Sequence, residues 1–78
     1  MKLWVVQYRE FDEEDQIYLC STEEYARQRA YNVLWDILEW RLQGTSIDIP
    51  STLEGAEQLC FDEEYAYINI YEQEVDNG

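Results

Sequence analysis

Side chains that commonly act as acids, bases or nucleophiles in enzymes are scarce in this sequence. The 78 residues include no histidine, which removes the commonest general base and metal ligand. The two cysteines, Cys20 and Cys60, form no CxxC pair, so they are expected to be small buried side chains. Two thiols do not complete a structural zinc site, and the acidic run 12–15 lacks the alternation and glycine of a calcium loop.

Nucleotide-binding loops are also missing from the sequence. It has three glycines, and none recurs at the spacing that cradles a phosphate. We therefore expect no enzymatic activity, no metal and no cofactor.

What remains is a large number of carboxylates interleaved with aromatic rings. Eighteen Asp and Glu against five Lys and Arg give a formal net charge of −13, while 46% of residues are hydrophobic and 15% aromatic. The chain is too apolar for a disordered acidic tail, and its charge exceeds the magnitude of about 2 to 8 recommended for solubility of a small domain. We therefore expect a strongly basic protein partner, because this charge would repel nucleic acid and anionic membranes.

The candidate partner-binding residues combine these two features. Two acidic runs are predicted to be exposed connectors that steer a basic partner, and aromatic residues are enriched among binding hot spots. The candidates are Asp12, Glu13, Glu14, Asp15, Trp35, Asp62, Glu63, Glu64, Tyr65, Tyr67 and Tyr71. The tetrapeptide Phe-Asp-Glu-Glu occurs at 11–14 and again at 61–64, which we interpret as chance in so acidic a sequence.

Three segments have the composition and alternation of β-strands. Residues 2–9 are apolar on both alternating faces, which predicts a central strand, and residues 16–20 fold back beside it as a hairpin. Residues 65–75 alternate between small or aliphatic side chains and tyrosines. We expect the aliphatic residues to pack under a helix and the tyrosines, with Trp4, to line the other face. The aliphatic residues are Ile17, Leu19, Ile68 and Ile70.

Two capping-box patterns predict the helices. Ser21-Thr-Glu-Glu begins a long helix that runs to about residue 43, where Gly44 can take the left-handed capping conformation. Ser51-Thr-Leu-Glu begins a short helix over 52–60, in which Gly55 costs about 1 kcal/mol relative to alanine.

The apolar arc of the long helix is wider than a single sheet contact needs. Tyr31, Trp35 and Leu42 belong to this second stripe. It is covered either by another protein, including a homodimer partner, or by the short helix and the connector 44–50.

These elements predict one α+β domain over residues 1–78. It would hold a three-stranded antiparallel sheet in ββααβ order, with one long and one short helix packed on one face. No apolar run is long enough to span a bilayer, and no signal peptide begins the chain, so we expect a cytoplasmic protein.

In size, charge and aromatic content, the sequence resembles the small phage-encoded inhibitors of bacterial defence, namely anti-CRISPR proteins and other DNA mimics. The resemblance is to a class. It covers the composition and the α+β pattern of the whole chain. It includes no signature motif, so it assigns a role to no individual residue. It implies inhibition of a nuclease or nucleoprotein complex in the bacterial cytoplasm by occupation of its basic nucleic-acid site.

Two other classes stay open. An antitoxin or immunity protein that neutralises a basic nuclease would also be small and acidic, and residues 35–40 superficially resemble the acidic helices of barstar-like proteins. A small adaptor or dimer subunit would explain the apolar arc of the long helix. A steep salt dependence of partner binding would separate the first two classes from the third.

Overall fold

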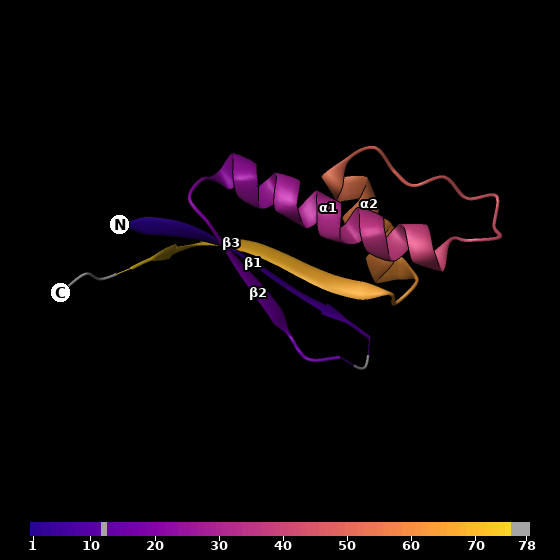
Figure 1. The fold of residues 1–78 in the computed structure, drawn as a ribbon, viewed down its shortest axis with the longest axis horizontal. Coiled ribbons are helices and arrows are strands. Elements are labelled where there is room, and N and C mark those ends of the chain that lie inside the picture. Colours follow the sequence, from indigo (N-terminus) through magenta and orange to yellow (C-terminus); the bar gives the residue numbers. More distant parts are fainter. Residues whose placement is uncertain (12, 76–78) are drawn as a thin grey trace.

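The computed structural model describes residues 1–11 and 13–75. The element order is β1 (Lys2–Glu10), β2 (Gln16–Cys20), α1 (Glu23–Arg41), α2 (Leu53–Asp62) and β3 (Ala66–Glu74). The strands form one antiparallel sheet in the order β2-β1-β3, and the helices lie on one side of it (Figure 1). The predicted fold class, the element order and the central first strand are thereby confirmed.

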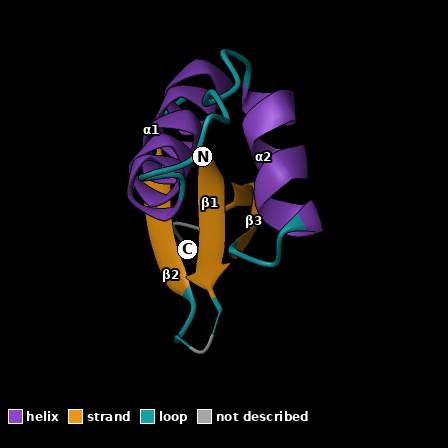
Figure 2. Cartoon of the chain, turned by 90° about the vertical axis from the view of Figure 1, so that its right-hand side faces the viewer, coloured by secondary structure: helices purple, strands orange, loops and turns teal. Residues whose placement is uncertain are grey.

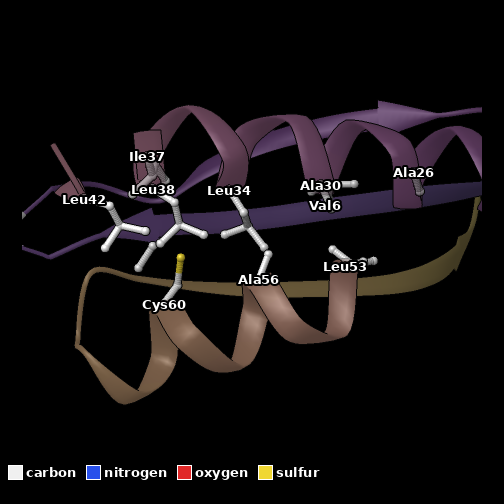
Figure 3. Packing of buried hydrophobic residues seen from close by; sticks show 11 residues of the cluster. Val6, Ala26, Ala30, Leu34, Ile37, Leu38, Leu42, Leu53, Ala56 and Cys60 are labelled. Carbon is white, nitrogen blue, oxygen red and sulfur yellow. The ribbon is translucent and has the colours of Figure 1, made fainter. Parts of the chain in front are cut away.

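The two helices cover different parts of the sheet. α1 contacts all three strands, whereas α2 contacts only β3 among them and stands beside it (Figure 2). The core lies between the helices and the sheet, with Leu34 and Leu38 of α1 facing Cys60 of α2 (Figure 3). Burial raises the pKa of Cys60 to about 11, so this thiol is protonated at neutral pH and packs as a small apolar group.

The pairing register assigns each strand residue to one of two faces. Val6 pairs with Tyr18 and with Ile70, and all three pack on the helix side of the sheet. The opposite face, which we call the open face, carries the odd-numbered residues of the three strands. Arg9 is the one charged residue among these odd-numbered strand residues.

The expected inward side of β2 is wrong. Ile17 and Leu19 lie on the open face, 56% and 64% exposed, while Tyr18 packs against the core. Trp4, expected on the open face, also packs on the helix side. Aromatic rings bury more apolar area than aliphatic side chains, and the buried alanines of α1 leave room for them. Since strand side chains alternate, this choice reverses the whole strand.

Each helix begins later than its capping box predicts. Thr22 is the N-cap of α1, its hydroxyl accepting a 3.1 Å hydrogen bond from the Tyr25 backbone N–H, and Thr52 caps α2 through Gly55 in the same way. Gly55 is required there because a Cβ would lie 2.9 Å from the Cβ of Pro50. α1 ends two residues before the predicted end, and Gly44 follows it with φ 80°, in the expected left-handed conformation.

α2 and the preceding connector cover the wide apolar arc of α1. Leu42 is buried, and the Tyr31 hydroxyl donates a 2.7 Å hydrogen bond to the Pro50 carbonyl oxygen. An ion pair between Arg27 and Glu54 also joins the two helices. The arc thus finds most of its contacts within the chain, so its width requires no second protomer.

Candidate functional site

Two connectors that are far apart in the sequence meet at one end of the sheet, at the right of Figure 1. Because β3 runs antiparallel to β1, Glu10 lies opposite Ala66, and the Phe11 backbone N–H donates to the Tyr65 carbonyl oxygen at 3.3 Å. We call this part of the molecule the acidic end. Its described carboxylates are Glu10, Glu13, Glu14, Asp15, Asp62, Glu63 and Glu64.

The structure therefore brings together most of the predicted acidic residues. Residues 13–15 and 62–64 are all exposed there. Tyr67 joins them with 38% of its surface exposed. Asp12, the remaining candidate of the first run, lies outside the described residues.

Three predicted aromatic residues lie apart from the exposed surface of the acidic end. Tyr65 is half-buried and packs against the core. Tyr71 lies on the open face opposite Val5, and both are remote from the connectors along the strands. Trp35, 38% exposed, follows Tyr31 by one helical turn on the flank of α1 that faces the connector before α2.

Two exposed phenylalanines at the acidic end are absent from the predicted set. Phe11 and Phe61 are 54% and 58% exposed, and the Phe61 ring meets the Tyr67 ring edge-on, with 5.8 Å between centroids. Each phenylalanine begins one copy of Phe-Asp-Glu-Glu. The recurrence that we interpreted as chance was therefore the signal that could have found them.

Both arginines near the acidic end are held over aromatic rings. The Arg9 guanidinium lies 5.6 Å from the centre of the Tyr67 ring, and its Nε is 3.8 Å from Oδ1 of Asp15. The Arg41 guanidinium lies 5.4 Å from the centre of the Tyr65 ring and 5.0 Å from that of the Trp40 ring. Two cations against seven carboxylates leave the acidic end strongly negative.

A strained residue terminates α2 within the acidic end. The Glu64 backbone N–H donates to the Phe61 carbonyl oxygen at 3.2 Å, and the Tyr65 N–H donates to that of Cys60 at 2.9 Å. This pair of bonds ends many helices and places one residue in the left-handed conformation, which glycine usually occupies. Here that residue is Glu64, with φ 57°. The chain thus keeps a carboxylate at this turn despite the strain.

Among residues 1–11 and 13–75, no three His, Cys, Asp or Glu side chains converge as metal ligands. In the same part of the chain, no helix is long and apolar enough to cross a membrane. A hollow of about 280 Å³ at the acidic end is lined by Arg9, Phe11, Glu13 and Tyr67.

Comparison of the chain with protein-family models, with curated proteins and with solved structures gives no match in any of the three.

Proposed function

We propose that this protein is a non-enzymatic inhibitor that binds, through its acidic end, the basic nucleic-acid-binding surface of a nuclease or nucleoprotein complex. It would act in the bacterial cytoplasm, like the anti-CRISPR proteins and DNA mimics that it resembles in composition. The observation that carries the proposal is the meeting of two acidic connectors, with their phenylalanines, at one end of the fold.

The distribution of charge supports a directed field rather than general solubility. The strand residues of the open face include no carboxylate, whereas the acidic end carries seven. A field concentrated at one end accelerates association with a basic surface, and exposed rings at its centre can anchor the complex once water is excluded.

Nucleic-acid channels are the basic surfaces that fit this field best. They place Lys and Arg to neutralise closely spaced phosphates, and carboxylates on a folded scaffold can take the place of those phosphates. The inhibitor would then compete with nucleic acid for one site and bind no nucleic acid itself.

Competitive elution tests the proposal. Nucleic-acid-binding proteins from a bacterial lysate are retained on immobilised DNA or RNA, and this protein is applied at constant moderate salt. We expect it to release a discrete protein, which mass spectrometry identifies, and to show no gel shift with duplex or single-stranded nucleic acid.

Two controls separate a specific surface from bulk charge. The variant Glu13→Gln/Glu63→Gln neutralises one carboxylate in each connector, and Glu23→Gln/Glu24→Gln removes the same charge at the start of α1. Release that is weakened only by the first variant supports the acidic end as the contact. Equal release by polyglutamate at matched charge, or retention of nucleic acid by the protein itself, would contradict the proposal.

A further inference from the structure

The β3 strand has one free edge. Within the part of the chain that the structure describes, β3 pairs only with β1 and lies at the border of the sheet. An unpaired strand edge presents a row of backbone donors and acceptors to which another extended chain can add.

Hydrogen bonds at the two ends of the β1–β3 ladder identify the free backbone groups. The Phe11 N–H donates to the Tyr65 carbonyl oxygen, and the Val75 N–H donates to that of Met1. Hydrogen-bonded pairs alternate along an antiparallel ladder, so the odd-numbered residues of β3 point their backbone groups at β1 and the even-numbered residues point theirs outward. Ala66 also has outward backbone groups, but it is 2% exposed, so a partner strand cannot reach them. The outward positions that remain are Ile68, Ile70, Glu72 and Glu74.

α2 stands beside this edge (Figure 2), and residues of both line a groove. The groove has a volume of about 500 Å³ and lies between one face of α2 and residues 66–68 of β3. Glu57 and Phe61, one helical turn apart, both line it. Glu57 forms no ion pair with a described residue, whereas Glu54, at the far end of the groove, already pairs with Arg27. The groove therefore offers an exposed carboxylate and an aromatic ring next to the free strand edge.

We propose that an extended Lys- and Arg-rich segment of the partner adds to β3 as a fourth strand. Its backbone would bond the outward groups of residues 68–74, its cations would meet Glu57 and Glu74, neither of which pairs with a described cation, and its apolar side chains would contact Phe61. The edge from 68 to 74 is roughly 23 Å long at about 3.3 Å per residue, enough for seven or eight partner residues. This inference rests on the proposed function, because both take the partner to be basic.

A second copy of this chain is the competing occupant of the edge. Pairing of two β3 edges would bring together the carboxylates of Glu72 and Glu74 from both copies, and each copy carries a net charge of −13. Like charges near one another in a strand pair are destabilising. A cationic segment instead meets charges of opposite sign, which is why the edge favours a basic partner over self-association.

The experiment uses the whole chain and the synthetic peptide (Lys-Val)₄. The control peptide has the same sequence with every backbone nitrogen methylated, so it keeps its charge and side chains but donates no backbone hydrogen bond. We expect the unmethylated peptide to slow amide hydrogen exchange at Ile70 and Glu72. We also expect it to bind at least about tenfold more tightly than the methylated peptide, a difference of about 1.4 kcal/mol in binding free energy.

A matched pair of protein variants tests the same edge. Glu72→Pro removes one outward N–H that the ladder with β1 does not use, a change that edge strands tolerate, whereas Glu72→Gln removes the same charge and keeps the N–H. We expect Glu72→Pro to weaken peptide binding about tenfold relative to Glu72→Gln, since a lost backbone bond is of this order. Circular dichroism of both variants checks that the fold is retained.

Several outcomes would overturn the inference: no measurable binding, equal affinity of the two peptides, exchange protection away from β3, or a dimer in sedimentation that Glu72→Pro dissociates. The competitive elution experiment separates this failure from that of the proposed function. If Glu72→Pro releases the nucleic-acid-binding protein as well as Glu72→Gln does, the strand addition is wrong and the proposed function stands. If the unaltered protein releases nothing, the proposed function is wrong.

Discussion

In the part of the chain that the structure describes, Glu64 is the one non-glycine residue with a positive φ. A left-handed conformation costs a residue with a Cβ about 1 to 2 kcal/mol. Replacing that residue by glycine regains less than this, because glycine loses more conformational entropy when the chain folds. We expect Glu64→Gly to raise the free energy of unfolding by about 0.5 to 1 kcal/mol relative to Glu64→Gln, which removes the same charge and keeps the Cβ.

The measurement is urea unfolding of the two variants at neutral pH, with thermal midpoints as a second readout. About 1 kcal/mol corresponds to roughly 4 to 8 °C in a domain of this size. Equal stability of the two variants would mean that the turn relaxes without strain. If Glu64→Gly also loses affinity for the eluted partner, the carboxylate at this turn contributes to binding at the expense of stability.

Tyr8 gives the fold a pH dependence in the alkaline range. Its ring stacks on Tyr18, with 5.8 Å between centroids, and the Arg29 guanidinium lies 4.0 Å from the Tyr18 ring. Burial, followed by the hydrogen bond with Tyr18, raises the pKa of Tyr8 to about 12 from an ordinary value of 10.0. The unfolded chain therefore loses this proton at a lower pH than the folded chain does.

The sign of the effect follows from that order. The contribution of Tyr8 is fully present below about pH 10 and is lost as pH rises toward about 12, because ionisation stabilises only the unfolded state in that window. The same hydrogen bond lowers the pKa of Tyr18, and Tyr8→Phe would remove it, so the reference is Tyr8→Phe/Tyr18→Phe, in which neither side chain ionises. We expect the urea midpoint of the unaltered protein to fall more steeply between pH 9 and 11 than that of this double variant, because the raised pKa of Tyr8 outweighs the lowered pKa of Tyr18. Parallel falls would show that Tyr8 ionises equally easily in both states.

At the scale of elements, the two acidic connectors are expected to control how fast a partner binds. They are exposed and lie at one end of the sheet. Loss of steering charge acts on association more than on dissociation, so Glu13→Gln/Glu63→Gln should slow association with the eluted partner by several-fold to about tenfold at low salt. Stopped-flow mixing at two salt concentrations measures both rates. An unchanged association rate with an intact fold would move the contact elsewhere.

The elements could be predicted from the sequence where one physical signal dominates. β1 is apolar on both faces, which only a central strand requires, and the alternation of β3 identifies Ile68 and Ile70 as its inward side chains. In β2 the signal is balanced, since Ile17 and Tyr18 are both apolar. Its orientation depends on how rings fill the space under α1, which is a property of the packed structure.

The candidate site shows a similar division between composition and tertiary structure. Acidic connectors are recognisable in the sequence, but their meeting depends on the antiparallel pairing of β1 with β3, which places Phe11 against Tyr65. The exposure of Phe61 and the separation of Trp35 from the acidic end depend on how each helix is rotated about its axis. Both N-caps were misplaced because two adjacent hydroxyl residues, such as Ser21 and Thr22, can each cap a helix.

At the scale of the whole molecule, self-repulsion should dominate the response to salt. The described residues form three ion pairs, all exposed, and exposed pairs contribute at most about 1 kcal/mol each. They join Lys2 to Glu72, Arg9 to Asp15 and Arg27 to Glu54. Most carboxylates therefore have no cation beside them to lose when salt is added.

We expect the thermal midpoint at about pH 7 to rise by a few degrees between low salt and about 0.5 M sodium chloride, where the Debye length is well below its value of roughly 10 Å at 0.1 M. Differential scanning calorimetry at several salt concentrations gives the trend. Sodium sulfate at matched ionic strength serves as a control for specific salt effects. A midpoint that falls with sodium chloride would mean that the ion pairs outweigh the repulsion.

The first and last strands also determine how the fold would yield to mechanical force. Met1 and Val75 are hydrogen-bonded to each other at the end of the sheet opposite the acidic end. Ladder bonds run perpendicular to the strands, so a force that separates Met1 from Val75 loads them one pair at a time, as in a zipper. β1 is the central strand, and its removal takes the whole sheet apart. The chain should therefore unfold at low force when pulled from these two ends, and the last pair to open is that between Phe11 and Tyr65, which holds the two acidic connectors together.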